Sequence, residues 1–97
     1  MARQIIWSIR AQNDRKAIFA YWNKHNKSNA YSKKLNRLFN EAIRLLSEHP
    51  HIGRTTILDN VHVKVVRDYL IIYEVTDQQV IVHTVWDGRR NPADLGL

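Results

Sequence analysis

The fold is decided by residues 61–86, which read VHVKVVRDYLIIYEVTDQQVIVHTVW. This stretch divides into three short strands, at about 61–66, 69–75 and 80–86, and polar residues separate them. The first strand has valines at alternate positions, whereas the middle strand is apolar almost throughout, as expected when both of its faces are covered. Because the two connections are short, we predict that the three strands form an antiparallel meander.

Two helices are predicted before this meander, within residues 11–49. In the second helix, apolar residues recur at steps of four and three: Tyr31, Leu35, Leu38, Ala42 and Leu45, widened by Phe39, Ile43 and Leu46. The polar run at residues 26–29 predicts a break between the helices, with Ser28 or Asn29 capping the second. The regular spacing indicates that the second helix buries one face against the sheet.

An N-terminal strand is predicted over Gln4–Ile9, because apolar and mixed positions alternate there. Asn13 and Asp14 are predicted as capping or first-turn residues of the helix that follows. The order of elements predicts an α+β fold: an N-terminal strand, a helical hairpin and then the three-stranded antiparallel meander, with the helices packed on one face of a twisted sheet. The length fits a single domain over residues 1–97. The second face of the sheet is then free to hold a site.

Several classes of function are not supported by the residues. No apolar run approaches the roughly 18 residues that span a bilayer, so no membrane association is predicted. The chain has no cysteine, which excludes disulfides and thiolate chemistry and fits a cytoplasmic location. Its five histidines show no metal-ligand spacing, and its three glycines form no nucleotide-binding pattern. We therefore predict neither a metal nor a cofactor.

The positive charge is concentrated in one part of the chain. The net charge is +6, yet residues 10–37 alone carry eight basic residues and one acidic residue. Such a surface attracts polyanions: nucleic acid, the ribosome surface or an acidic partner protein. The alternative is that these residues only form a solvated helix face.

A candidate site is predicted from basic and imidazole side chains on and beside the sheet: Lys64, Arg67, His83, Arg89 and Arg90. Arginine binds phosphate oxygens in pairs and can stabilise a pentavalent transition state. Lysine or histidine can move the proton of a 2′-hydroxyl, so the set suits metal-free ribonuclease chemistry. Structural roles stay open, since a histidine within a strand is often only hydrogen-bonded and the paired arginines could be solvated.

The sequence resembles the RelE/ParE superfamily of bacterial toxins from type II toxin–antitoxin pairs. The matching segments are Ile6–Ser8 followed by Ala11, Ala30 opening a helix, Leu46–Arg54, Val66–Val75, Val80–His83 and Trp86–Pro92. Together they cover roughly residues 4–92, in the order and at the spacing of that superfamily.

The resemblance implies an antitoxin that forms a hetero-oligomer with the toxin, and one of two activities. RelE-like members cut mRNA on the ribosome without a metal, and ParE-like members block DNA gyrase. Lys64 falls near the strand where RelE-like nucleases carry lysines, and Arg89 and Arg90 match the arginine that follows their last strand. Two departures are visible: the central strand reads Leu70–Ile72 where the nucleases usually carry an arginine, and the tyrosine or histidine common near their C-terminus is missing. The long helical hairpin is more similar to the ParE branch.

Three hypotheses about function follow from these observations. In the first, the chain cleaves mRNA on the ribosome with Lys64 and the three arginines, and with His83 or His62 as the acid or base. In the second, it binds gyrase without catalysis and the same arginines are contact residues. In the third, it is a basic nucleic-acid-binding domain with no toxin activity.

Overall fold

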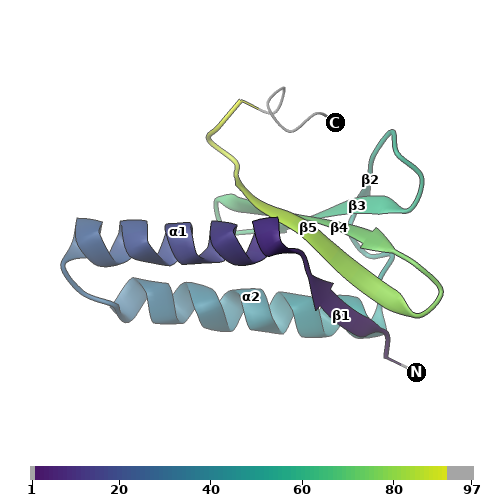
Figure 1. Ribbon diagram of the computed structural model, residues 1–97, viewed down its shortest axis with the longest axis horizontal. Helices are drawn as coiled ribbons and strands as arrows, with labels where there is room; N and C mark the ends of the chain where they lie inside the picture. Colours follow the sequence, from purple (N-terminus) through teal and green to yellow (C-terminus); the bar gives the residue numbers. More distant parts are fainter. Residues whose placement is uncertain (1, 92–97) are drawn as a thin grey trace.

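The computed structural model describes residues 2–91, in which a helical hairpin packs on one face of a five-stranded sheet (Figure 1). The elements follow in the order β1 (Gln4–Trp7), α1 (Ile9–Asn26), α2 (Ala30–Glu48), β2 (Arg54–Thr55), β3 (Val61–Val66), β4 (Tyr69–Val75) and β5 (Gln79–Asp87). The sheet order is β1-β5-β4-β3-β2, and β3, β4 and β5 form the predicted antiparallel meander. The α+β prediction is therefore confirmed.

The structure adds a strand at each edge of this meander. The N-terminal strand β1 pairs in parallel with β5, so that Gln4 lies opposite Gln79. The two-residue strand β2, which the sequence pattern does not reveal, pairs antiparallel with β3 at the other edge. β4 is consequently the central strand, as its apolar sequence predicts.

The hydrophobic core lies between the hairpin and one face of the sheet. Leu35, Phe39 and Leu46 of α2 are fully buried, together with Ile71 and Tyr73 of β4. Burial of this kind contributes about 1.5–3 kcal/mol for each large side chain. The predicted apolar stripe of α2 is correct except at Leu45, which is 42% exposed, whereas the neighbouring Leu46 of the same stripe is fully buried.

The start of α1 differs from the sequence prediction. β1 ends at Trp7 rather than at residue 9, and Ile9 already belongs to the helix with its side chain 77% exposed. Ser8 is the N-cap: its Oγ accepts from the backbone N–H of Ala11 at 3.0 Å and donates to the carbonyl of His83 at 2.8 Å. Asn13 and Asp14 lie beyond the first turn of a helix that begins at Ile9, so the prediction that they are capping or first-turn residues is wrong.

Asp14 accepts hydrogen bonds from the sheet and does not cap the helix. β1 pairs with β5 only as far as Val82, so the following residues of β5 have no strand neighbour on that side. Asp14 reaches over from α1, and its Oδ2 accepts from the backbone N–H of Val85 at 3.1 Å and from the hydroxyl of Thr84. A helix side chain thus replaces a missing strand partner.

We expect Asp14→Ala to destabilise the protein by about 1–3 kcal/mol, because the N–H of buried Val85 and the hydroxyl of buried Thr84 both lose their acceptor. Chemical denaturation measures this loss. Asn13→Ala is the matched control, since Asn13 is exposed on the same helix and should change stability little. Equal losses from the two variants would contradict the role given to Asp14.

The hairpin turn matches the predicted break. Lys27 ends α1 in the left-handed conformation with φ of 53°, and Asn29 precedes α2 without a side-chain cap. Ser28 Oγ accepts from the N–H of Ala30 at 3.2 Å. The hairpin projects well beyond the sheet in Figure 1. Neither helix of the described chain is long and apolar enough to cross a membrane.

Candidate functional site

Two turns meet at one end of the sheet and bring three of the predicted arginines to the same region. Arg67 lies in the β3–β4 turn, where its φ of 56° is in the left-handed region. Arg89 and Arg90 lie in the turn that follows β5. The N–H of Gly88 donates to the carbonyl of Asp68 at 2.7 Å, which joins the two turns. All three arginines are exposed.

A cleft of about 320 Å³ separates this end of the sheet from α1. Its lining includes the buried Tyr69 and Val85 of the sheet and the half-buried Ile18 of α1. The exposed Arg89 and Arg90 also line it, so apolar surface and positive charge lie side by side. Such a combination suits an apolar side chain that is flanked by acidic groups, as well as a phosphate.

The two neighbouring arginines are held in different ways. Arg89 donates through Nε to Asp87 Oδ1 at 3.0 Å and through Nη2 to Oδ2 at 2.8 Å. This pairing lowers the pKa of the Asp87 carboxyl and raises the pKa of Arg89. Arg90 instead lies over the ring of Trp86, with its guanidinium carbon 4.1 Å from the ring centroid. Arg90 therefore keeps its hydrogen-bonding face more available than Arg89 does.

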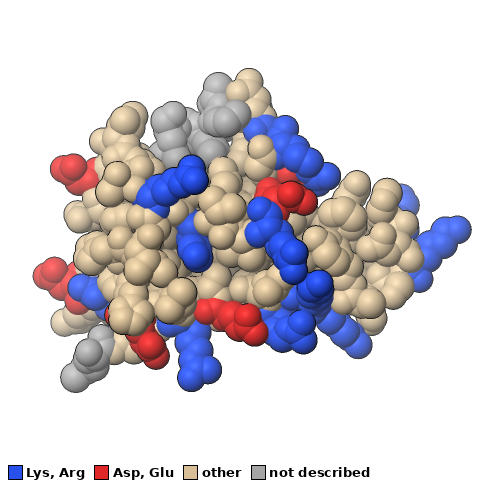
Figure 2. Space-filling view, turned by 180° about the vertical axis from the view of Figure 1, so that it is seen from behind, with Lys and Arg blue, Asp and Glu red and all other residues tan. Residues whose placement is uncertain are grey.

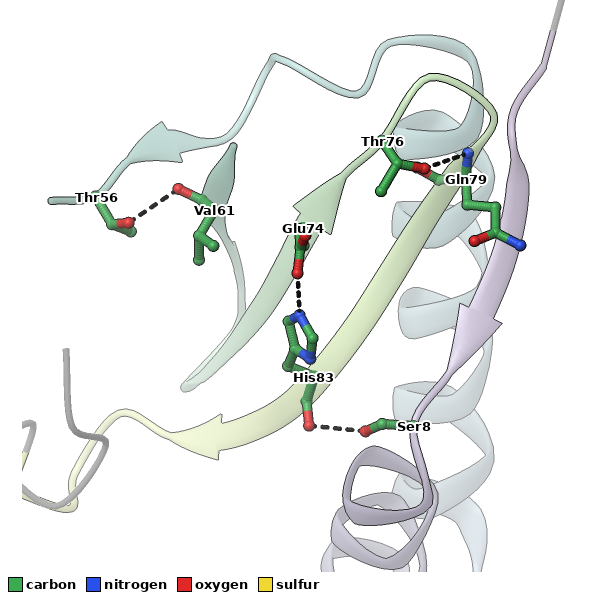
Figure 3. A network of polar contacts seen from close by, with 7 residues as sticks. All are labelled: Ser8, Thr56, Val61, Glu74, Thr76, Gln79 and His83. Atoms are coloured by element: carbon green, nitrogen blue, oxygen red, sulfur yellow. Dashed lines mark hydrogen bonds and ion pairs between the residues drawn. The ribbon is translucent and has the colours of Figure 1, made fainter. Parts of the chain in front are cut away.

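His83 lies on the sheet face that the helices do not cover. Its Nε2 is 2.8 Å from Glu74 Oε1 on the neighbouring strand, and Figure 3 shows the two side chains facing each other with a helix behind the sheet. The register shifts at this point, because Tyr73 pairs with Val82 and Ile72 with Thr84, which leaves His83 as the extra residue. His83 is thus engaged in a cross-strand pair.

Lys64 points to the opposite face. It lies across from Ile71, whose side chain belongs to the core beneath the helices, and directly opposite residues in a sheet share a face. His62, two residues before Lys64, shares that face and stacks on Tyr73 with ring centroids 5.5 Å apart. The structure therefore brings together Arg67, Arg89 and Arg90 and separates Lys64 from His83.

Within residues 2–91, no three histidine, aspartate or glutamate side chains gather as they would to hold a metal ion. Two carboxylates line the cleft beside α1, but Asp14 accepts from the N–H of Val85 and Asp87 pairs with Arg89.

A family model described as "ParE toxin of type II toxin-antitoxin system, parDE" matches residues 5–92, which is nearly the whole chain. The chain belongs to the ParE toxin family. It is therefore a toxin of a type II toxin–antitoxin system within the RelE/ParE superfamily, and an antitoxin is its expected partner.

Among solved structures, the chain is similar to one from P. aeruginosa titled "Chromosomal ParDE TA system". The TM-score is 0.75 at 13% sequence identity, over 89% of this chain and 96% of that chain. At this identity the similarity establishes the shared fold. No curated protein matches the chain.

The α1 wall of the cleft is the part of this ParE toxin that sequence reasoning missed. Asp14, Ala17, Ile18 and Tyr21 line the cleft from α1, and Tyr21 is 49% exposed. Their spacing of three, one and three residues places them on one helix face, which is a signal that the sequence does contain. Pro92, the last residue of the matching segments, lies outside the described residues.

Proposed function

We propose that this toxin inhibits DNA gyrase in the cytoplasm by binding it without catalysis, and that its antitoxin neutralises it. The observation that carries the proposal is the placement of Lys64 and His83 on opposite faces of the sheet. A nuclease needs its acid, its base and its phosphate-binding arginines around one scissile bond, within about 2.6–3.2 Å of the protons they move. Membership of the ParE family supports the same choice.

The remaining groups suit contact with a protein better than proton transfer. His83 is occupied by Glu74, and Arg89 is occupied by Asp87. What the end of the sheet presents is exposed arginine beside an apolar cleft, and arginine and aromatic side chains are the residues that dominate protein interfaces. A binding surface requires only that these groups be exposed and rigidly held.

Two parallel assays with purified toxin test the proposal. In a gyrase reaction on supercoiled plasmid, we expect toxin-dependent loss of supercoiling activity and linear DNA after protein removal. In a reconstituted translation reaction, we expect the mRNA to stay intact. Cleavage of mRNA on translating ribosomes with gyrase unaffected would reject the proposal and restore the nuclease hypothesis. Activity in neither assay would favour a nucleic-acid-binding domain without toxin activity.

We expect Arg67→Lys to keep growth inhibition close to that of the unaltered toxin. In a binding surface the charge matters more than the fork of the guanidinium, and lysine retains that charge in an exposed turn. Were Arg67 a transition-state contact, the same change would reduce mRNA cleavage about 10²–10³-fold. Growth of cells after induction of Arg67→Lys and of the unaltered toxin distinguishes the two cases. The affinity of Arg67→Lys for the antitoxin, measured in vitro, should be nearly unchanged.

Two further variants test Arg67 and Lys64 separately. Arg67→Gly removes the charge while suiting the left-handed φ of 56°, so any loss of toxicity reports the side chain and not strain.

Lys64→Ala removes a half-buried cation on the helix-covered face and should leave gyrase inhibition intact. A large loss of mRNA cleavage in Lys64→Ala would support the nuclease hypothesis instead.

A further inference from the structure

The helical hairpin contains a long stretch without any acidic residue. Residues 15–40 carry seven basic residues and no aspartate or glutamate. Arg15 is half-buried, where it lies over Trp7 and donates to Asn36. The other six basic side chains are exposed: Lys16, Lys24, Lys27, Lys33, Lys34 and Arg37. No ion pair within the described residues neutralises any of the six.

Four of these lysines gather at the end of the hairpin farthest from the sheet. Lys24 lies in the last turn of α1, Lys27 ends that helix, and Lys33 and Lys34 lie near the start of α2. Figure 1 shows this end projecting past the sheet, and Figure 2 shows basic but no acidic side chains there. A projecting surface of one charge sign, which supplies little to the core, is available to a partner.

We propose that the tip of the hairpin binds the phosphate backbone of duplex DNA. The choice of DNA among polyanions rests on the proposed function, since gyrase acts on duplex DNA and a toxin bound to gyrase would lie beside it. The lysines supply phosphate contacts, and the exposed side chains of Ser28 and Asn29 add hydrogen-bonding groups between them. The tip thus extends the toxin's contact from the enzyme to its substrate.

The aromatic side chains of the hairpin favour a duplex over single-stranded RNA. Proteins that bind single strands use free aromatic rings on which unpaired bases stack. Here Trp22 packs against Tyr31 with centroids 4.8 Å apart and donates to the hydroxyl of Tyr69 at 2.7 Å. Tyr21 stacks on His25. Because these rings contact one another, we expect the tip to bind nucleic acid through its positive charge and not through base stacking.

Fluorescence anisotropy with a labelled duplex of random sequence tests the proposal on the toxin alone. We expect binding that weakens steeply with salt, because each neutralised phosphate releases counterions and contributes about 0.9 to the slope of log K against log salt. The tip variant Lys24→Gln/Lys33→Gln/Lys34→Gln should lower the magnitude of that slope by about 3 and weaken binding about tenfold or more. Lys27 is left unchanged because of its left-handed backbone.

The control variant removes the same charge elsewhere, by Arg10→Gln/Arg44→Gln/Arg54→Gln, at exposed positions away from the tip. It should retain most of the affinity. Equal losses from both variants would overturn the proposal, because binding would follow net charge alone. Tighter binding to single-stranded RNA than to the duplex would also overturn it, as would tip-dependent binding of the antitoxin with no binding of DNA. Because gyrase is absent from this experiment, its outcome does not depend on whether the toxin inhibits that enzyme.

Discussion

Replacing Arg89 and Arg90 together by alanine is expected to abolish growth inhibition while the protein stays folded. Both side chains are exposed in the turn after β5 and line the cleft beside α1. Their contacts are an exposed ion pair with Asp87 and a stack on Trp86, neither of which holds the core together. Removing both takes away the positive charge at the cleft, where we place contact with the target.

Induction of the variant in growing cells measures toxicity, and circular dichroism with thermal melting measures the fold. Arg44→Ala/Arg54→Ala is the matched control, since it removes two exposed cations elsewhere and should remain toxic. A fully toxic Arg89→Ala/Arg90→Ala variant would remove these arginines from the functional surface. A variant that fails to fold would show instead that they are structural partners of Asp87 and Trp86.

Gly53→Ala is expected to destabilise the protein by about 3 kcal/mol or more, because a single methyl group has no room there. A Cβ at this position would lie 2.4 Å from the hydroxyl of Tyr73 and 2.8 Å from the carbonyl of Val63. Overpacking costs about 1–3 kcal/mol. The displaced Tyr73 hydroxyl would also lose its donation to Pro50 at 2.8 Å and the N–H of Gly53 at 3.0 Å, which adds about 1–3 kcal/mol.

A double-mutant cycle with Tyr73→Phe checks this account by urea denaturation. Tyr73→Phe alone should cost about 1–3 kcal/mol, because the buried carbonyl of Pro50 and the N–H of Gly53 lose their partner. Once the hydroxyl is absent, the new methyl group of Gly53→Ala no longer meets its nearest obstacle. The double variant should therefore lose less stability than the sum of the losses in the two single variants. Strict additivity would show that the clash with Val63 dominates instead.

Elements with a regular pattern were predictable from the sequence, and elements that depend on distant partners were not. The spacing of Leu35, Phe39 and Leu46 in α2 reports burial directly, because a helix repeats its face every 3.6 residues. The alternation of apolar residues continues to Ile9 although Ile9 is exposed, so the pattern predicts a longer N-terminal strand than β1. The helix begins after Ser8, whose hydroxyl caps it at the N–H of Ala11 and also donates to the distant carbonyl of His83.

The candidate site was predictable in composition but not in arrangement. Arg67, Arg89 and Arg90 occupy turns, and turns at one end of an antiparallel sheet come together whatever the register. Lys64 and His83 lie within strands, where the face that a side chain occupies depends on pairing and on the bulge at His83. That bulge leaves no signature in the sequence of β5.

The parallel pairing of β1 with β5 joins the beginning of the chain to nearly its end. During synthesis, β1 therefore waits without its partner until β5 has left the ribosome, while the local hairpin of α1 and α2 can already form. The sheet cannot be completed before β5 is present: a chain that stops before Gln79 leaves both β1 and β4 without the strand that lies between them. The functional surface, which includes the turn after β5, can therefore assemble only after β5 has been synthesised and has joined β1 to β4.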